Sequence, residues 1–482
     1  MAPRLPTNLF LVSPRSVCCG KALRRMALCG MMVGVAVLLL GCGSTADTTA
    51  PVETPRSFSE TGTQEVPDRW WTAFENETLN ALVDSATAAN FTLRTAWERL
   101  QAARAVVDRE SGALFPTLEA SAQAEARRTD AADGRGEAEN VESLQLGLSS
   151  AYEVDLWGRI RARVQAEQYR VDATRADYQA AALSLSAEVV RTWYQWAEAQ
   201  NQRALVQSQI ETNQKVLRLL QNRFKTGQIR SVDILRQRQL LESTREQRAV
   251  VESRAQVLEH RLAVLLGRTP QQGVSAEPDS LPALSPLPDT GVPTDLVRRR
   301  PDVQSAFNAL KAADRELAAA ISDQYPRLTL SASASTAAES ATNLFRDWAY
   351  AFGGNLLAPL FRGGELRAEV NRTEAVRQQR LYEYGQTILT AFEDVENALV
   401  REAKQREQIR QLETQVRLAR RAYDQLRVQY LNGTTDYLDV LTALDEVQQL
   451  RRSLLSARLT LVQDRIALYR ALAGAFETDR ER

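Results

Sequence analysis

The side chains that most often carry chemistry are scarce in this chain of 482 residues. All four cysteines, Cys18, Cys19, Cys29 and Cys42, lie within the first 42 residues, and His260 is the single histidine. A Cys/His zinc site, a cysteine nucleophile and a histidine-based triad are therefore largely excluded from the rest of the chain. Carboxylates remain, but none of them forms a constellation that suggests catalysis. We do not expect an enzyme.

Cys42 is the one thiol whose surroundings indicate a role. Basic residues precede an uncharged apolar run over residues 26–41, which is shorter than the roughly 20 residues of a membrane-spanning helix. A basic segment followed by a short apolar run is typical of a secretory signal. The run ends in Leu-Leu-Gly-Cys at residues 39–42, which resembles a bacterial lipobox. We predict that Cys42 becomes the acylated first residue; an uncleaved anchor helix or an ordinary signal peptide is the alternative.

Beyond this segment the chain is built from two copies of one unit. Residues 93–118 parallel residues 303–328, and each stretch is a helical run that ends in an aromatic residue and a proline. A long internal repeat of this kind determines the architecture. The predicted segments are a signal peptide (1–41), a lipid-anchored flexible tether (42–67), a first repeat (68–269), a Pro-rich connector (270–294), a second repeat (295–474) and a C-terminal tail (475–482).

After each aromatic–proline pair, the hydrophobic period changes from helical to alternating. Two alternating runs follow in each half, and they predict strands of about 11 to 14 residues, which can cross a bilayer when tilted. These runs begin near Leu118, Leu144, Leu328 and Trp348. Each pair leads into a helical run without proline, from about residue 160 to 226 and from about 365 to 432. Such helices are roughly 100 Å long.

Four strands per chain cannot close a membrane barrel, because the smallest such barrels have about eight. Open sheet edges are not tolerated in lipid, so several copies must pool their strands. Three copies would supply twelve, followed by a cylinder of helices. We therefore expect a mixed membrane protein in which several chains contribute four strands each to a β-barrel that is continuous with a long α-helical barrel, with an internal structural duplication in each chain. Such an assembly is a duct.

Two stretches outside the predicted strands resemble a known family. Residues 66–105 carry a pattern that includes Trp70 and Trp71, and residues 296–313 contain Arg-Pro-Asp-Val, with Phe307 where a glutamate is usual. Together with two glycine turns, they resemble the TolC-like outer-membrane efflux factors, in their lipoprotein (NodT-type) branch. The resemblance implies a homotrimer with a trimeric 12-stranded β-barrel in the outer membrane and a long α-helical barrel that projects into the periplasm. There a periplasmic adaptor would link it to an inner-membrane pump.

The same resemblance implies the channel component of a tripartite efflux system, a passive exit duct for small molecules or drugs delivered by the pump. The sequence has no Walker-type nucleotide motif, so the energy would come from the pump. No cofactor is expected apart from covalent lipid on Cys42. Lys plus Arg and Asp plus Glu both number 60, and this balance argues against a nucleic-acid binder.

The two glycine turns correspond when the halves are compared. Gly227 and Asp233 align with Gly433 and Asp439. Chain reversal at glycine and polar helix capping account for these turns without any further function. In the resembling family the turns dock the adaptor. The implied docking residues are Gly227, Ser231, Asp233, Gly433 and Thr434.

Asp439 matches the family position of an acidic ring where the periplasmic aperture narrows. Asp436 lies about one helical turn earlier and either reinforces that ring or caps the following helix. Three copies of each carboxylate around a narrow axis would attract cations and resist closure by mutual repulsion.

Two rival functions remain. A protein-secretion duct served by a different inner-membrane partner would have the same strands and long helices. A non-transporting periplasmic coiled-coil lipoprotein would need no alternating runs after Pro116 and Pro326. Measured pore formation in planar bilayers would therefore separate this second rival from a duct.

Overall fold

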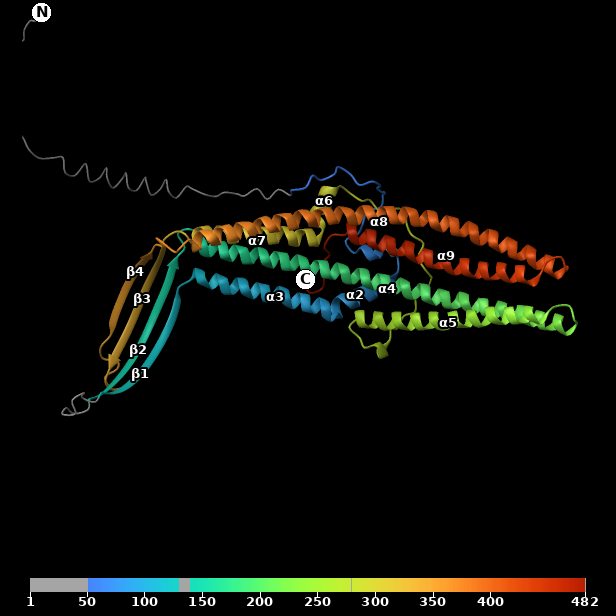
Figure 1. Cartoon of the computed structure of the whole chain (residues 1–482). Helices are drawn as coiled ribbons and strands as arrows, with labels where there is room; N and C mark the ends of the chain where they lie inside the picture. The colour runs from blue at the N-terminus through green and yellow to red at the C-terminus, as the bar shows by residue number, and fades with distance from the viewer. Residues whose placement is uncertain (1–50, 130–138, 279, 482) are drawn as a thin grey trace, which may run out of the picture. The chain divides into compact units, whose positions relative to one another are not determined.

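A computed structural model describes residues 51–129, 139–278 and 280–481 (Figure 1). The helices are α2 (Glu77–Ala89), α3 (Phe91–Ser111), α4 (Arg159–Lys225), α5 (Ser231–Leu265), α6 (Pro293–Arg299), α7 (Pro301–Ser322), α8 (Glu365–Leu431) and α9 (Tyr437–Leu472). The short 3₁₀ helices are η1 (Trp70–Phe74), η2 (Gly112–Leu114) and η3 (Pro270–Gln272). The strands are β1 (Thr117–Thr129), β2 (Glu139–Val154), β3 (Arg327–Ala338) and β4 (Ala349–Leu357). In the described ranges, no helix has both the length and the apolar character needed to traverse a membrane.

The four strands form one antiparallel sheet in the order β1-β2-β3-β4. At the end where the helices join, Val154 of β2 pairs with Leu328 of β3, and Arg327 of β3 pairs with Leu357 of β4. β1 and β4 are the edges, and neither has a strand on its outer side among the described residues. The sheet is therefore open, with two edges that can pair with other chains.

Two strands differ in length from the predicted value of about 11 to 14 residues. β2 has 16 residues, whereas β4 has 9 and begins one residue after Trp348. The last pair of the β3–β4 ladder is Ser335 with Ala349. The chain forms a turn between the two strands, and the hydroxyl of Thr336 in β3 donates to the Leu344 carbonyl of this turn.

The predicted duplication is reproduced element by element. α3 and α7 begin at Phe91 and Pro301, and β1 and β3 begin at Thr117 and Arg327, so the offset is 210 residues in both cases. α4 and α8 begin 206 residues apart, and both contain 67 residues. α5 and α9 keep the offset of 206. The difference of four residues therefore falls within the strand hairpins.

The long helices α4 and α8 contain no proline and are rich in Ala, Leu, Arg, Glu and Gln, which favour helix. Each follows a glycine in the left-handed region, Gly158 (φ +75°) and Gly364 (φ +90°). α4 packs along α5 and α7, and α8 packs along α9 and α7 (Figure 1). Two helical hairpins thus follow the two strand hairpins.

Aromatic side chains form the main core beside the middle of α4. Trp193 and Tyr194 of α4 are buried with Trp70, Trp71 and Phe74 of η1. The ring centroids of Phe74 and Tyr194 are 5.3 Å apart. A second apolar cluster joins α6, α7 and α8, and a third joins the hairpin ends near the two glycine turns.

Part of the segment predicted to be a flexible tether is packed. Phe58 is buried against Phe392 of α8, with ring centroids 6.3 Å apart. The backbone N–H of Ser59 donates to Glu396 Oε1 at 3.0 Å, and Gln64 forms a β-bridge with Pro288 of the connector. Apolar burial and these hydrogen bonds fix this stretch onto α8 and the connector, so a free tether is wrong for it.

The C-terminal tail also packs onto the helices. Phe476 meets Trp71 edge-on, with ring centroids 4.8 Å apart. The hydroxyls of Thr478 and Tyr178 are 2.8 Å apart, and both residues are buried. The tail therefore contributes to the main core.

Candidate functional site

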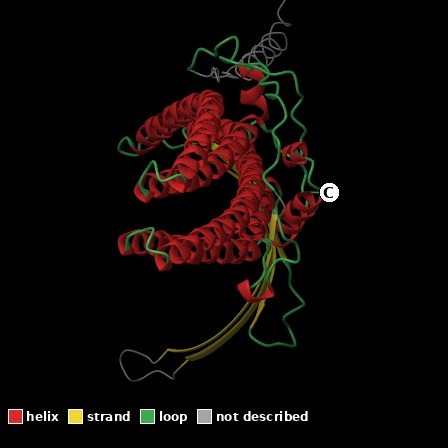
Figure 2. Cartoon of the chain, turned by 90° about the vertical axis from the view of Figure 1, so that its right-hand side faces the viewer, coloured by secondary structure: helices red, strands yellow, loops and turns green. Residues whose placement is uncertain are grey.

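Loops join the long helices at their far ends (Figure 2). The two glycine turns there end their helices with the same hydrogen bonds. Gly227 N–H donates to Phe224 O at 2.9 Å, and Gly433 N–H donates to Tyr430 O at 3.1 Å. In both turns the next N–H donates to the carbonyl four residues before the glycine, at 3.0 Å. This is the Schellman motif, which requires a left-handed residue. The φ angles of Gly227 and Gly433, +73° and +76°, meet that requirement.

The turn residues predicted to dock an adaptor are mostly exposed. Gly227, Ser231, Gly433 and Thr434 all face solvent in the described chain. Thr434 Oγ1 donates to Gln429 O at 3.1 Å, which helps to close its turn. No atom lies within 4 Å of a Cβ placed on either glycine, so the backbone angle and not crowding selects glycine there.

Asp233 and Asp439, which align in the sequence, have different environments. Asp233 is 5% exposed, and its Oδ2 accepts the backbone N–H of Arg230 at 3.3 Å. Asp439 is exposed, and its Oδ2 accepts the hydroxyl of Thr435 at 2.7 Å. Of the predicted docking and aperture carboxylates, Asp233 therefore serves the start of α5, whereas Asp439 remains available to solvent.

Asp436 stands at the N-cap position of α9, but its side chain makes no capping hydrogen bond. Its carboxylate is 80% exposed, and Oδ1 lies 4.0 Å from Nη2 of Arg230, the N-cap residue of α5. The exposed carboxylates of Asp436 and Asp439 thus both lie at the start of α9. An aperture role for either one stays a prediction.

Contacts that the sequence did not indicate join the two hairpin ends. The Tyr437 hydroxyl donates to Oε1 of Gln237, and the rings of Tyr437 and Tyr430 are 5.4 Å apart. The Arg223 guanidinium lies 5.2 Å from the Tyr430 ring centroid and donates to Leu431 O at 3.3 Å. Burial raises the pKa of Tyr437.

A buried amide pair lies deeper between the helices. Asn213 of α4 and Gln448 of α9 exchange hydrogen bonds of 3.3 and 2.9 Å, and Asn213 Nδ2 also donates to Thr244 of α5 at 2.9 Å. All three residues are buried. Because buried amides must find partners, this network favours one register of the three helices.

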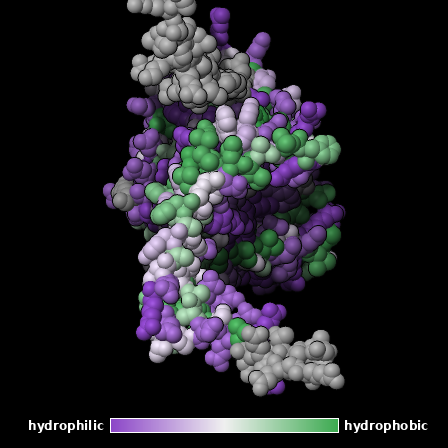
Figure 3. Space-filling view, turned by 90° about the vertical axis from the view of Figure 1, so that its left-hand side faces the viewer, coloured by the Kyte–Doolittle hydropathy of each residue, from purple (hydrophilic) through white to green (hydrophobic). Residues whose placement is uncertain are grey.

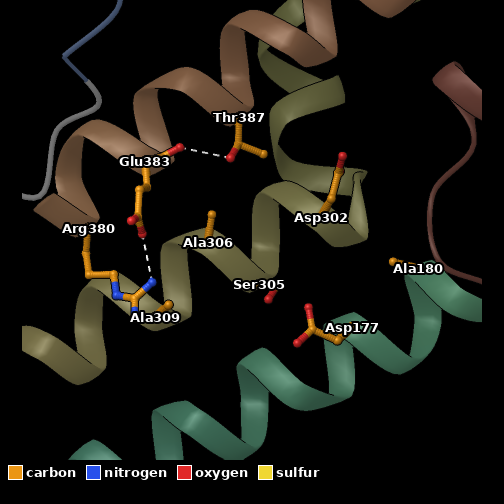
Figure 4. Close-up of a pocket in the computed structure, with 9 residues that line it drawn as sticks. All are labelled: Asp177, Ala180, Asp302, Ser305, Ala306, Ala309, Arg380, Glu383 and Thr387. Atoms are coloured by element: carbon orange, nitrogen blue, oxygen red, sulfur yellow. Dashed lines mark hydrogen bonds and ion pairs between the residues drawn. The ribbon is translucent and has the colours of Figure 1, made fainter. Parts of the chain in front are cut away.

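A pocket of about 340 Å³ lies between α4, α7 and α8 (Figure 4). Three carboxylates line it: Asp177, Asp302 and Glu383. Glu383 Oε2 accepts from Arg380 at 2.7 Å, and Asp302 Oδ2 accepts from Arg300 at 2.7 Å. Burial alone would raise the pKa of Asp302, but its bonds with Arg300 outweigh burial and lower that pKa. Two of the carboxylates are therefore held by arginines.

The Arg-Pro-Asp-Val stretch at residues 300–303 has a structural role beside this pocket. Pro301 is the first residue of α7, where its missing N–H is tolerated. Arg300 is buried and bonds Asp302 on α7 as well as Asp394 on α8, the latter at 3.0 Å. Arg300 therefore fastens the start of α7 to α8.

Cys42, the predicted lipid anchor, lies outside the described residues. Within the described ranges, no group of three or more His, Cys, Asp or Glu side chains is arranged to hold a metal ion. The candidate site of the described chain is thus the pair of turns with Asp436 and Asp439.

The family profile described as "Outer membrane efflux protein" matches residues 82–268 and 292–474. The pyoverdine export outer membrane protein OpmQ of Pseudomonas aeruginosa is 30% identical over 461 residues, which cover 93% of this chain and 97% of OpmQ. The cation efflux system protein CusC of Escherichia coli is 26% identical over 455 residues, which cover 92% of this chain and 98% of CusC.

Among solved structures, the outer-membrane channel OprN has the same fold. Its TM-score is 0.83 and its sequence identity is 30%, and the match covers 90% of this chain and 99% of OprN. Both repeats, the sheet and the long hairpins lie within these matches. The chain belongs to the outer membrane efflux protein family.

Proposed function

We propose that this family member is the passive exit duct of a tripartite efflux system. Three copies pool their sheets into a 12-stranded barrel, and their helices continue it as a tunnel into the periplasm. A periplasmic adaptor docks at the glycine turns, and an inner-membrane pump supplies the energy. Covalent lipid on Cys42 assists attachment to the outer membrane.

The chain is an outer-membrane channel component for efflux, and its fold is that of the family's channels: four strands per chain followed by a helical barrel. The predicted fold class is confirmed. The strands after Pro116 and Pro326 contradict the rival reading as a non-transporting coiled-coil lipoprotein.

The observation that carries the proposal is an open sheet whose strand hairpins lead directly into helices of 67 residues. Asp155 follows β2, and its carboxylate accepts the backbone N–H groups of Ile160 and Arg161 at 3.2 and 3.0 Å. Burial opposes the charge of Asp155, but these bonds lower its pKa.

Trp157, also in this junction, connects the two halves of the chain, because its Nε1 donates to Pro326 O at 2.7 Å. A barrel built from such sheets would open directly into the helical tunnel.

The exposure of the two glycine turns to solvent supports the docking of an adaptor there. Each chain presents two turns with the same Schellman geometry, so a partner with repeated helical tips could recognise both in the same way. Asp436 and Asp439 add exposed negative charge beside the second turn. The first turn has no equivalent pair of exposed carboxylates. Arg230 occupies the position that corresponds to Asp436, and Asp233, which corresponds to Asp439, is buried.

The cargo is proposed to be small molecules selected by the pump. The relatives carry names for pyoverdine export and for cation efflux, two chemically different cargoes on one architecture. This variety favours a duct that does not itself select. The proposal includes no catalytic step and no cofactor, since the pocket carboxylates Asp302 and Glu383 are engaged by arginines.

The test combines conductance with crosslinking. The purified full-length protein should form long-lived ion-conducting pores in planar bilayers, and a photo-crosslinker at Ser231 or Thr434 should capture a co-expressed adaptor. A crosslinker at Arg346, an exposed residue in the β3–β4 connection, is the control and should capture none. Absence of pores would refute the duct; equal capture at all three positions would refute docking at the turns. Unchanged palmitate labelling in Cys42→Ser would refute the lipid anchor.

A further inference from the structure

Large apolar side chains are exposed at the end of the sheet where the helices join. Leu360 and Phe361, directly after β4, are 95% and 90% exposed. Trp157 and Tyr325, which are also exposed, stack with ring centroids 5.0 Å apart at the ends of β2 and β3. Figure 3 views this side of the chain and shows apolar surface gathered between hydrophilic surface. An apolar belt at one level of a membrane sheet is typical of a lipid interface.

A pocket of about 470 Å³ opens within this belt. It is lined by Asp323 and Arg327, at the start of β3, and by residues 357–362, which connect β4 to α8. Its wall therefore combines the apolar side chains of Leu360 and Phe361 with two guanidinium groups.

The carboxylate of Asp323 is already fully engaged. Its Oδ1 accepts from Arg327 at 2.6 Å and lies 3.7 Å from Nε of Arg159, and its Oδ2 accepts from Arg163 at 3.0 Å. Three arginines thus share this single carboxylate. Both oxygens of this carboxylate therefore already face guanidinium groups.

Arg362 forms no ion pair with any described residue, although it lines the same pocket. Glu153 pairs with Arg159 at 2.7 Å, and within the described chain no other carboxylate besides Asp323 bonds these arginines. The pocket lining itself holds two arginines, Arg327 and Arg362, and one carboxylate, Asp323, so the lining carries a net positive charge. Positive charge alone would suit any anion, but the adjoining apolar wall favours an anion that carries hydrocarbon chains.

We propose that this pocket binds the headgroup of an anionic phospholipid in the periplasm-facing leaflet. Arg362 and Arg327 hold the phosphate, for which the planar guanidinium is well suited, and Leu360 and Phe361 contact the acyl chains. The inference rests on the outer-membrane placement of the sheet and on the proposed duct, whose helices project into the periplasm.

The test measures lipid binding to the detergent-purified, delipidated full-length channel by native mass spectrometry. Phosphatidylglycerol and phosphatidylcholine of equal chain length are titrated separately. We expect the anionic lipid to bind about fivefold or more tightly than the zwitterionic one, because one arginine near the membrane surface contributes about 1 kcal/mol to the binding of an anionic lipid. Arg362→Gln should remove most of this preference, whereas Phe361→Ser should weaken both lipids alike. Arg346→Gln, an exposed arginine between β3 and β4, is the matched control and should change nothing.

Equal affinity for the two lipids, or equal effects of the two arginine variants, would overturn the proposal. Displacement of phosphatidylglycerol by inorganic phosphate, but not by chloride at the same ionic strength, would assign the pocket to a free anion instead. Loss of the oligomer in Arg362→Gln would assign Arg362 to a contact between copies. Conductance is measured on every variant and on the unmodified channel. Pores without a preference between the two lipids would refute the lipid site alone. Absence of pores in the unmodified channel would refute the duct.

Discussion

Asp233 and Asp439 are both the third residue of their helices, α5 and α9, yet one is buried and the other faces solvent. Asp233 accepts a backbone N–H at the start of α5, and Asp439 accepts only the hydroxyl of Thr435. The duplicated turn has therefore kept one carboxylate for structure and left its counterpart exposed. Substitutions at the two aspartates should therefore have different effects.

Asp439→Asn should change ion conduction. Removing one exposed carboxylate per chain should lower cation selectivity and weaken Mg²⁺ block about fivefold, which corresponds to about 1 kcal/mol. Single-channel recording in planar bilayers measures both quantities. Asp424→Asn is the control, because Asp424 is exposed and already paired with Arg420. An unchanged block in Asp439→Asn would contradict the aperture role.

Asp233→Ala should lower stability. It leaves the Arg230 N–H without its acceptor at the start of α5, which should lower the free energy of unfolding by about 1–2 kcal/mol. Asp439→Ala should change it by less than about 0.5 kcal/mol, because Asp439 is exposed. Denaturant titration of the two variants provides the comparison. Equal effects would show that burial does not distinguish the two positions.

Gly227→Ala and Gly433→Ala should each destabilise the protein by about 1–2 kcal/mol, because an L-residue is strained at positive φ. Gly112→Ala is the matched control: Gly112 has φ −56° and open space around its Cβ position. That substitution should be neutral or slightly stabilising. Thermal unfolding midpoints test the series, and a neutral Gly433→Ala would argue that its turn can relax.

Glu402→Gln should be among the more damaging single substitutions. Glu402 and Arg465 are both 1% exposed and bonded at 2.6 Å, and Arg465 also donates to Ser285 O of the connector at 3.0 Å. Removing one charge of a buried pair costs about 3–5 kcal/mol. Limited proteolysis should then cut the connector faster. Glu413→Gln, in an exposed pair with Arg458, should cost less than about 1 kcal/mol.

Asp464→Asn should stabilise the protein at neutral pH. Burial on α9 raises the pKa of Asp464 to about 6, so folding opposes its ionisation. The folded state then binds more protons than the unfolded state between the unfolded value of 3.8 and about 6, and stability falls as pH rises through that interval. Because Asp464 is only half buried, we expect a gain of about 1 kcal/mol above pH 6 that fades toward pH 4. A gain in stability that does not change with pH would show that it does not come from the buried charge of Asp464.

Much of the fold could be predicted because its signals are local and repeated. The helical period, the change to alternation after Pro116 and Pro326, and the glycines at 227 and 433 each act over a few residues. The structure places α4 and α8 within a residue or so of their predicted ends. The strand starts were less accurate, because β2 begins at Glu139, five residues before the predicted Leu144.

Long-range contacts were beyond such local signals. Tyr437 and Gln237 are 200 residues apart, and their hydrogen bond depends on how two hairpins are placed beside each other. The packing of Phe58 onto α8 likewise depends on a surface formed by residues more than 300 positions later. A polar composition predicted a flexible tether there, but one buried aromatic residue outweighed it.

The amino-acid sequence therefore determined the duplication, the four strands, the long helices and the positions of the turns, because short-range periodicity and glycine conformation specify them. Only the tertiary structure decided which copy of an equivalent residue is buried. Asp233 and Asp439 are both the third residue of their helices, and their different burial arises from the unequal neighbours that packing gives to the two halves of one chain.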